Sequence, residues 1–544
     1  MNILASIFLF IYLLINGQAL LSRPNLIPYP NSISFSNESL KINPCSIAFQ
    51  FNSVYLTLGE IPKYYSDILD FFYKATFPES HCQFNLQRNA LKRRTVGRIE
   101  ESSTLNVNIK NVEDLNPQFP SKSTNESYSL DLDSNIWILE AENYHGFLRG
   151  LETFFQLLEP TDDAVQYQIN YFPIHINDYP SFGYRGVMID TARHFIKLST
   201  LKHVLDGMLF HKLNVFHWHI VDEESFPLQL ESFPEITEYG AYSSKEIYTR
   251  EDVDEIIQYA RVRGIRVIPE VDSPAHSMSW GFSPGLSDIA LRCPIWANYN
   301  GQLDPTLNKT YNVVKGVLDD VTSYFADEYV HLGGDEVSYS CWESKPWIKA
   351  FMVANNISSG IELQNYYKNR EKTLLDSSLS TIFWVKDANF DYEENDILQY
   401  WGASTQYSLI QNYSNPVILS PYDYLYIDVG YGNAFGDASW APFITWKDIY
   451  KFNPYPKEIE KSRILGGEVT LWAEVNSDST TDNHLWSRSS AFAERMWNAL
   501  IHDGDADIVS RLVGNEKRLI RRGFNVSPAT SEYCGLHLDI CFSS

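Results

Sequence analysis

The chain has 544 residues, of which 44% are hydrophobic and 14% aromatic. A chain of this length exceeds what one hydrophobic core usually supports, so we expect at least two domains with a sizeable interior, and a disordered protein is excluded. The formal net charge of -25 would repel a polyanion, and no basic run or nucleic-acid motif offsets it, so nucleic acid is excluded as a partner.

The N-terminal residues form an uncharged apolar stretch. Residues 3–15 contain no charged side chain and are followed by Gly17 and Ala19. The stretch is short for a membrane span and has small residues where a signal peptidase cuts, so residues 1–22 are predicted to be a cleaved signal peptide. An uncleaved membrane anchor is the alternative, because Leu20 and Leu21 extend the apolar run. Charge or proline interrupts every later apolar run, so we expect no membrane span in the mature protein.

Six cysteines form an even set in a chain with a secretory signal, which favours three disulfides. Fifteen pairings are open, and we favour bonds between sequence neighbours. A zinc site is the competing interpretation, but no CxxC motif occurs and the cysteines are dispersed. The cysteines are Cys45, Cys82, Cys293, Cys341, Cys534 and Cys541. Asn-x-Ser/Thr sequons agree with the secretory route. They begin at Asn37, Asn125, Asn308, Asn356, Asn412 and Asn525.

Residues 23–178 combine two kinds of periodicity. Segments 104–109 and 127–132 alternate apolar and polar residues, which is typical of strands, whereas residues 144–158 follow a helical pattern. This region is therefore predicted to be a smaller α+β domain.

From residue 179 onward, short apolar runs end in polar or charged residues and are separated by helical stretches. Eight such runs occur, at 184–190, 214–222, 266–272, 329–336, 381–387, 396–401, 417–428 and 464–474. Strands alternating with helices in this way predict an α/β fold, a (β/α)8 TIM barrel over residues 179–514, followed by a C-terminal helix and a disulfide-closed tail over 515–544. An open doubly wound sheet is the alternative, but no glycine-rich phosphate motif follows the first run.

The predicted strands carry many reactive side chains near their ends. In a parallel barrel the carboxyl ends of the strands converge over one face, where active sites lie. Any one of these residues can equally be a helix cap, but groups from eight separate runs are hard to explain as caps. The candidates are Arg185, His217, His219, Asp222, Asp272, His276, Asp335, Glu336, Trp384, Trp401, Tyr426, Asp428, Trp472 and Glu474.

Residues 331–336 read His-Leu-Gly-Gly-Asp-Glu and form the sharpest local pattern. Two glycines let the backbone approach a ligand closely, and the adjacent carboxyls of Asp335 and Glu336 raise the proton affinity of one member of the pair. Such a pair suits catalysis in which one carboxyl is an acid and the other stays ionised. Solvated surface carboxylates are the alternative, which the buried-strand pattern of residues 329–332 weakens.

Two further patterns concern ligands. His217 and His219 lie on the same face of one predicted strand, a spacing also found in metal sites. Histidines that line a barrel are the commoner case, so we expect no metal and no cofactor. Trp384, Trp401 and Trp472 fit a sugar site, because the apolar face of a pyranose or an acetamide methyl packs on an indole ring, although any one of them can be a core residue.

Six segments together resemble the family 20 glycoside hydrolases, most closely the β-N-acetylhexosaminidases of lysosomal type. They are residues 145–154, 184–194, 212–219, 331–336, 471–474 and 493–497. The resemblance covers nearly all of the chain after residue 22. It also implies three local disulfides, Cys45–Cys82, Cys293–Cys341 and Cys534–Cys541.

The resemblance implies an exo-acting, retaining hydrolase that releases terminal β-linked GlcNAc or GalNAc. In its substrate-assisted mechanism the acetamido oxygen of the sugar attacks the anomeric carbon and gives an oxazolinium intermediate. Glu336 is expected to protonate the leaving oxygen and then activate water, while Asp335 orients the acetamido N–H. Tyr426 is expected to hold the acetamido oxygen, and Asp222 with His276 to adjust the proton affinity of Glu336.

The remaining implied residues bind the sugar. They are Trp384, Trp401 and Trp472 around the acetamide methyl, Arg185 and Glu474 at the outer hydroxyls, and Asp428 near the 6-hydroxyl.

The chain departs from the family pattern at three places. Ala275 stands where glycine is common, which we expect to be tolerated. Residues 384–387 lack the Gln-Glu pair that often follows the tryptophan, which leaves the contacts to the leaving sugar open. Val429 stands where relatives that accept sulfated sugars carry a basic residue, so neutral terminal sugars are expected to be preferred.

Two other functions compete with this interpretation. A catalytically dead, lectin-like relative is disfavoured because both carboxyls and Tyr426 are present. An endo-acting chitinase is disfavoured because its Asp-x-x-Asp-x-Asp-x-Glu signature is absent. The expected partners are oligosaccharide, glycoprotein or glycolipid substrates, the resemblance implies a homodimer, and the secretory signal together with the acidic composition favours the lysosome or the extracellular space.

Overall fold

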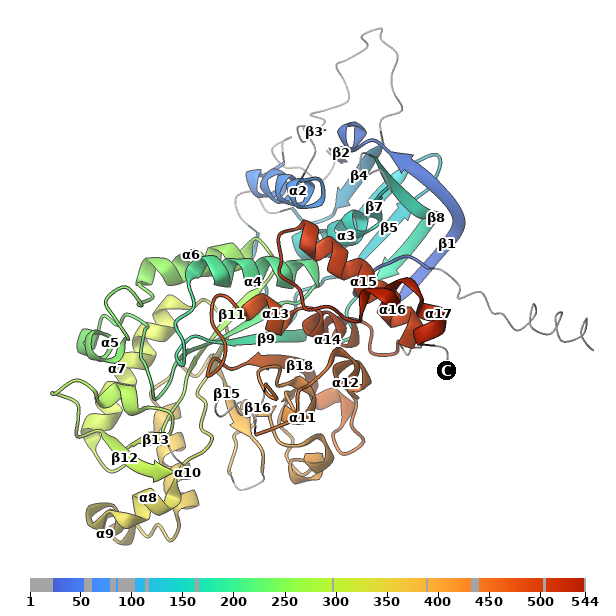
Figure 1. The fold of residues 1–544 in the computed structure, drawn as a ribbon. Coiled ribbons are helices and arrows are strands. Elements are labelled where there is room, and N and C mark those ends of the chain that lie inside the picture. The colour runs from blue at the N-terminus through green and yellow to red at the C-terminus, as the bar shows by residue number, and fades with distance from the viewer. Residues whose placement is uncertain are drawn as a thin grey trace, which may run out of the picture.

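The structure is a computed structural model that describes residues 23–52, 61–78, 85–86, 103–112, 117–161, 166–295, 298–387, 390–431, 440–501 and 505–542. The predicted signal peptide and Cys82 lie outside these residues. Figure 1 shows a sheet domain at the top, in blue to cyan, and a larger domain below it, with the C-terminal helices in red lying where the two meet.

The N-terminal domain is built on an eight-stranded sheet of order β1-β8-β5-β6-β4-β2-β3, with β7 paired to β8. Every second residue of β4 and β5 is buried, because successive side chains of a strand point to opposite faces. Helix α3 packs against β5 and β6, and the Asn143 side chain caps its first turn. The strands are β1 Ser32–Ile42, β2 Ala48–Phe51, β3 Asn85–Leu86, β4 Thr104–Ile109, β5 Tyr128–Leu132, β6 Trp137–Ala141, β7 Leu158–Pro160 and β8 Tyr167–Asp178. The helices are α2 Lys63–Thr76 and α3 Tyr144–Gln156, with a short 3-10 helix, η1 Pro44–Ser46.

The predicted barrel is confirmed, since eight parallel strands close in the order β10-β11-β14-β15-β16-β17-β18-β9. Every residue of β9, β10 and β11 is buried, as expected for parallel strands covered on both faces. The strands are β9 Tyr184–Asp190, β10 Val215–Val221, β11 Arg266–Val271, β14 Tyr329–His331, β15 Ser380–Val385, β16 Ile397–Tyr400, β17 Val417–Leu419 and β18 Ile464–Leu471. Two of the predicted runs are mostly loop, because β14 and β17 each have only three residues.

Helices and one hairpin surround the barrel (Figure 1). The helices are α4 Leu198–Phe210, α5 Pro234–Gly240, α6 Arg250–Arg261, α7 Asn308–Tyr324, α8 Tyr339–Ser344, α9 Pro346–Ala354, α10 Gly360–Lys372, α11 Tyr422–Leu425, α12 Trp446–Lys451, α13 Thr481–Leu485 and α14 Arg488–Trp497. The short 3-10 helices are η3 Met278–Gly281, η4 Ser404–Leu409 and η6 Lys461–Arg463. Strands β12 Ala290–Ile295 and β13 Asn298–Leu303 form the hairpin.

The C-terminal tail differs from the prediction in where it begins. Helix α15 runs over Asp505–Arg521, so the predicted boundary between residues 514 and 515 falls inside a helix. This helix belongs to the body of the protein, because Arg511 donates to the buried Glu494 carboxylate and Arg522 to Glu152 of the N-terminal domain. Helices α16 Glu532–Leu536 and α17 Leu538–Cys541 follow, joined by the predicted Cys534–Cys541 disulfide.

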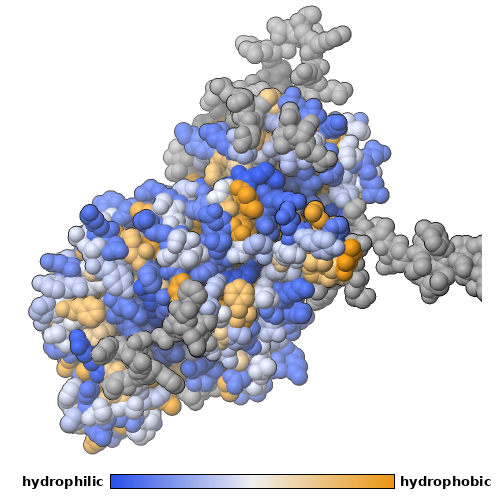
Figure 2. Space-filling view, in the orientation of Figure 1, coloured by the Kyte–Doolittle hydropathy of each residue, from blue (hydrophilic) through white to orange (hydrophobic). Residues whose placement is uncertain are grey.

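The predicted sequons and two of the predicted disulfides can be located in the structure. All six sequon asparagines are exposed. Cys293–Cys341 is bonded as predicted, and Cys45 is also in a disulfide. Figure 2 shows a mainly hydrophilic face with scattered apolar side chains. Among the described residues, no helix combines the length and the apolar character that crossing a membrane requires.

Candidate active site

The paired carboxyls follow β14 on a loop with two glycines, of which Gly333 has no room for a side chain. Gly333 and Gly334 have φ values of 64° and 93°, in the left-handed region that favours glycine. A Cβ atom on Gly333 would lie 1.8 Å from Oδ1 of the buried Asp272. The same Asp272 oxygen accepts a hydrogen bond from the Gly334 N–H at 2.8 Å. The Asp272 side chain therefore fixes the loop just before Asp335.

Asp335 has a carboxyl oxygen that is enclosed but unpaired. Its Oδ1 atom is buried and has no hydrogen-bond partner among the described residues. Burial raises the pKa of Asp335 to about 6, and the neighbouring Glu336 carboxylate adds to the shift. Asp335 therefore holds a proton more readily than an ordinary aspartate does.

Glu336 lies in a different environment, with 45% of its side chain exposed. The His276 ring, whose Nε2 atom is 3.5 Å from Glu336 Oε2, lowers the pKa of Glu336 through a hydrogen bond. The pair therefore has one carboxyl with raised proton affinity, as predicted. In this structure that carboxyl is Asp335 and not Glu336, the expected acid, because the exposed Glu336 faces a cation whereas the Oδ1 atom of the half-buried Asp335 is enclosed.

Asp222 and His276 lie behind Glu336, where the sequence placed them. His276 Nδ1 is 3.2 Å from Asp222 Oδ1, and Asp222 is fully buried. Although burial opposes it, the charge of Asp222 raises the pKa of His276 well above its usual value. His276 is therefore held as an imidazolium ion between two carboxylates.

Aromatic rings gather beside this group. The ring centroids of Trp384 and Trp472 are 5.8 Å apart, and those of Tyr426 and Trp472 are 6.2 Å apart. Burial, together with the Asp335 carboxylate, raises the pKa of Tyr426 well above its usual value, so its hydroxyl stays protonated and can donate. Trp401 follows β16, and Lys386 Nζ lies over its ring, 4.3 Å from the ring centroid. The rings of Trp384, Trp472 and Tyr426 form an apolar wall, and Tyr426 lies next to Asp335.

Asp428 and Glu474 complete the polar part of the site. Asp428 Oδ1 is buried and has no partner among the described residues. Burial and the charge of Glu474 raise the pKa of Asp428 well above its usual range. Glu474 is exposed and follows β18. Val429, the residue after Asp428, is fully buried and adds no positive charge to the site.

Arg185 does not belong to the site, and this corrects the prediction. It is the second residue of β9, so it lies at the amino edge of the barrel, opposite the carboxyl ends. Its side chain is fully buried. Its Nη2 atom donates to Glu126 at 2.6 Å, and its Nε and Nη2 atoms donate to the Lys212 carbonyl. Arg185 therefore joins the barrel to the N-terminal domain.

Arg193 brings a guanidinium to the site, and the sequence argument missed it. It lies three residues beyond the end of β9 and contacts Asp190, Asp222 and Glu224 at 3.3, 2.8 and 3.3 Å. Its guanidinium carbon lies 5.0 Å from the Trp472 ring centroid. The signal was available in the sequence, because residues past a strand end reach the carboxyl face whereas residues at a strand start do not.

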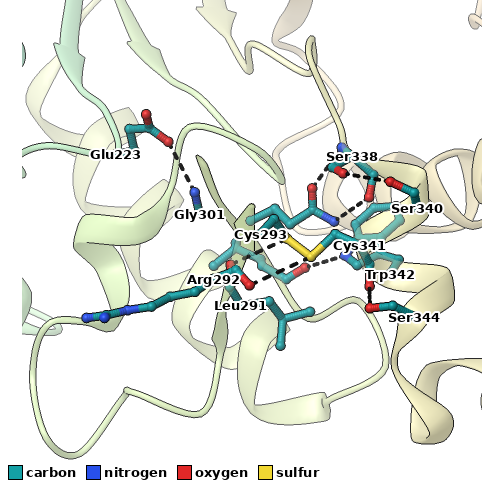
Figure 3. Close-up of a disulfide and its surroundings, with 12 residues drawn as sticks. Glu223, Leu291, Arg292, Cys293, Gly301, Ser338, Ser340, Cys341, Trp342 and Ser344 are labelled. Atoms are coloured by element: carbon teal, nitrogen blue, oxygen red, sulfur yellow. Dashed lines mark hydrogen bonds between the residues drawn. A yellow bond between two sulfur atoms is a disulfide. The ribbon is translucent and has the colours of Figure 1, made fainter. Parts of the chain in front are cut away.

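A disulfide-linked hairpin braces the loop after Glu336 (Figure 3). Cys293 of β12 is bonded to Cys341 of α8. The buried Gln302 side chain of β13 accepts from the Ser338 N–H at 2.8 Å and donates to the Ser338 carbonyl at 3.1 Å. Two residues after Glu336, the backbone is thus held on both sides. Figure 3 also shows Glu223 accepting from the Gly301 N–H, which ties the hairpin to the loop after β10.

Comparisons with known proteins place the chain in a family. A family model described as glycosyl hydrolase family 20, catalytic domain, matches residues 182–500, and one described as beta-acetyl hexosaminidase like matches residues 26–157. Beta-hexosaminidase subunit beta of Mus musculus is 36% identical over 434 residues, which cover 76% of this chain and 77% of the relative. The Homo sapiens protein of the same name is 36% identical over 437 residues, with 76% and 74% covered.

Solved structures are similar over almost the whole chain. The chitobiase of Flavobacterium johnsoniae aligns with a TM-score of 0.74 at 26% identity, covering 92% of this chain and 73% of that one. An exo beta-N-acetylglucosaminidase of Vibrio harveyi, solved with N-acetylglucosamine, aligns with a TM-score of 0.75 at 23% identity, covering 93% and 79%. The second likeness concerns the fold alone. Together with the matched domains and the relatives, these findings show that the chain belongs to glycosyl hydrolase family 20.

Proposed function

We propose that this protein is an exo-acting β-N-acetylhexosaminidase that releases terminal β-linked GlcNAc or GalNAc with retention of configuration. The observation that carries the proposal is the unpaired, buried Oδ1 atom of Asp335 beside the aromatic wall. A buried carboxylate oxygen without a donor costs free energy unless a ligand supplies one. An acetamido group supplies an N–H for Asp335 and a methyl group for the tryptophans, so one substituent satisfies both parts of the site.

The reaction then proceeds in two displacements. In the first, the acetamido oxygen forms a bond to the anomeric carbon as the glycosidic bond breaks, and Glu336 gives its proton to the departing oxygen. In the second, water adds to the anomeric carbon, its proton passes to Glu336, and the bond to the acetamido oxygen breaks. Two inversions at one carbon give net retention. Tyr426 donates to the acetamido oxygen, and Asp335 stabilises the positive charge of the oxazolinium ring.

Substrate binding also places the proton where the first step needs it. An acetamido N–H that donates to Asp335 favours its ionised form, and a sugar that covers the half-exposed Glu336 favours its neutral form. Both effects move the shared proton from Asp335 to Glu336. The two carboxyls therefore reach their working states only when a sugar with an acetamido group is bound.

The polar corner of the site suits uncharged sugar hydroxyls. Arg193 and Glu474 are placed to hold outer hydroxyls, and Asp428 to accept from the 6-hydroxyl. A 6-sulfate would bring its negative charge toward the Asp428 and Glu474 carboxyls, and the buried Val429 offers no positive charge from its position. We therefore expect neutral chromogenic substrates to be cleaved at least ten-fold faster than 6-sulfated ones, and equal rates would refute this assignment.

The role of Glu336 is tested by substituting Glu336→Gln and comparing two leaving groups. A sugar leaving group needs a proton, whereas nitrophenolate does not, so the loss should be about 10²- to 10⁴-fold for a disaccharide and smaller for the nitrophenyl glycoside. The exposed Glu394→Gln variant is the matched control and should keep full activity. Equal losses on both substrates would contradict an acid role, and full activity on both would remove Glu336 from the mechanism.

The cellular setting of the enzyme is the secretory pathway, ending in the lysosome or outside the cell, with glycoprotein, glycolipid or oligosaccharide substrates. Two disulfides, exposed sequons and the apolar N-terminus of the sequence support this part of the proposal. A homodimer follows from the family resemblance alone. Glycosidase digestion of the secreted protein and its mass in solution test the two statements separately.

A further inference from the structure

A line of buried imidazoles and carboxylates runs through the barrel interior toward the catalytic acid. His217 Nδ1 is 2.8 Å from Glu468 Oε1, and His217 Nε2 is 2.8 Å from Glu270 Oε2. The same Glu270 oxygen is 2.8 Å from His219 Nδ1, and His219 Nε2 is 2.8 Å from Asp222 Oδ2. Side chains from β18, β10 and β11 thus alternate between base and acid.

The line reaches the catalytic acid through His276. Asp222 continues to His276 Nδ1 at 3.2 Å, and His276 Nε2 is 3.5 Å from Glu336 Oε2. We call this set the interior chain, and it consists of Glu468, His217, Glu270, His219, Asp222 and His276. The first five side chains are fully buried.

The geometry of the interior chain sets the charge of its two inner histidines. An ionised carboxylate only accepts hydrogen bonds, whereas a neutral imidazole has one donor and one acceptor nitrogen. Both ring nitrogens of His217 and of His219 lie 2.8 Å from carboxylate oxygens. The contacts to Glu468 and Asp222 are hydrogen bonds, whereas those to Glu270 Oε2 are ion-pair contacts without hydrogen-bond geometry. An unprotonated nitrogen would set its lone pair against a carboxylate, so only an imidazolium ion is favourable on both sides of each ring. Two such cations also offset the charges of Glu468, Glu270 and Asp222, which would otherwise be buried beside one another.

The directions of the proton affinities agree with this arrangement. Although burial opposes it, the carboxylates raise the pKa of His217 to about 9 and that of His219 well above its usual value. The facing imidazoles hold the pKa of Glu270 well below its usual range, against the effect of burial. His331, which stacks on His217 at 4.7 Å, differs, because its Nδ1 accepts from the Gly333 N–H and burial lowers its pKa to about 3.

Other groups face the interior chain from each neighbouring strand. The Glu468 carboxylate accepts from Tyr184 Oη at 2.7 Å and from Gln399 Nε2 at 2.6 Å. Asp190 and the Trp472 ring face His219, and Arg193 contacts Asp222. Asp272 faces His276, and Arg193 Nη2 lies 3.3 Å from the His276 Nδ1 atom. Asp335, Lys386 and Arg193 face Glu336. The Trp384 indole N–H donates to the second Glu270 oxygen at 2.6 Å.

We propose that Glu270 is a positioning residue that couples the aromatic wall to the catalytic acid. One of its oxygens orients the Trp384 ring, and the other holds His219, which acts on Glu336 through Asp222 and His276. The two inner histidines are permanent imidazolium ions. This inference rests on the proposed roles of Trp384 and Glu336 for its effect on catalysis, whereas the charge states do not depend on them.

The charge states are tested in the wild-type protein, with no substitution that endangers folding. In the ¹⁵N spectrum of the histidine-labelled enzyme, the two inner histidines should stay protonated on both ring nitrogens at pH 8, and their signals should change in Glu270→Gln. Imidazolium signals lost by pH 7 would overturn the proposal. A divalent ion held by His217, Glu270 and His331, whose ligand atoms lie within 4.8 Å of one another, would need unprotonated nitrogens and would overturn it as well.

The coupling to catalysis is tested by the pH dependence of kcat/KM in Glu270→Gln. The amide oxygen of the substituted side chain can still accept from the Trp384 indole N–H. The NH₂ group of that side chain then faces His217 and His219, each of which has lost one proton. This exchange removes one net positive charge from the barrel interior, so the rate profile should move to higher pH by about half a unit to one unit.

Two controls separate this effect from a general loss of packing. Trp384→Phe removes only the second Glu270 contact and should weaken binding of a thiazoline inhibitor without moving the pH profile. His211→Gln removes a buried histidine that bonds Gly207 and Ser490 far from the site, and it should leave the profile in place. An unmoved profile in Glu270→Gln, or an equal shift in either control, would refute the coupling. Full activity of Glu336→Gln would instead refute the proposed function and leave the spectrum of the histidines unchanged.

Discussion

Replacing Asp335 by asparagine should stabilise the fold at neutral pH while abolishing most activity. Burial raises the pKa of this carboxyl from 3.8 to about 6. Its ionised form is therefore unfavourable in the folded protein, and the associated stability, fully present below about pH 3.8, is lost as the pH rises through about 6. The shift corresponds to a destabilisation of about 2 to 3 kcal/mol at pH 8.

The assay is thermal unfolding of wild type and Asp335→Asn between pH 4 and pH 8. Asparagine has nearly the same shape but no charge, so the variant should melt a few degrees higher at pH 8, and the difference should vanish near pH 4. Glu394→Gln removes an exposed charge and should show no such pH dependence. A variant that is less stable at pH 8, or a gain that persists at pH 4, would show that Asp335 is not a strained functional carboxyl.

Three further outcomes follow from the structure. Gly333→Ala should cost roughly 2 to 5 kcal/mol of stability and most of the activity, because its Cβ atom would meet the Asp272 side chain. Gly334→Ala has its nearest contact at 3.4 Å and should cost only the backbone strain of about 1 to 2 kcal/mol. Equal melting temperatures of the two variants would contradict this. Arg193→Lys should lower kcat/KM at least ten-fold while the protein stays stable. Arg185→Lys should lower the free energy of unfolding by about 3 kcal/mol and leave the activity of the folded molecules unchanged. The reverse pattern would show that Arg185 belongs to the site. Dialysis against a strong chelator should leave activity unchanged, and loss of activity that returns with a divalent ion would revive the metal interpretation.

The barrel could be predicted from the sequence because its strands are buried on both faces. Runs such as Tyr184–Asp190 are apolar throughout their middle and end in a polar residue, and this pattern depends on local sequence alone. The Asp335–Glu336 pair was predictable for the same reason, since its glycines and carboxyls are adjacent. The C-terminal boundary was not, because α15 is anchored by Glu494 and Glu152, which lie far away in sequence.

Tertiary packing decided the points at which sequence reasoning failed. Arg185 and Arg193 lie in one motif, and only their places relative to the ends of β9 separate a structural arginine from one in the site. Asp335 has the higher pKa of the pair because its Oδ1 atom is buried, while Glu336 faces His276, a residue from another strand end. Neither the burial of Asp335 nor the contact of Glu336 with His276 can be predicted from two adjacent residues in the sequence.

The most direct measurement replaces the acetamide of a nitrophenyl glycoside stepwise by fluoro-, difluoro- and trifluoroacetamide. Each fluorine withdraws electrons from the carbonyl oxygen without enlarging the group much. If that oxygen is the nucleophile that Asp335 and Tyr426 hold in place, kcat should fall steeply and in order along the series. A kcat that stays constant across the four substrates would contradict participation of the acetamide.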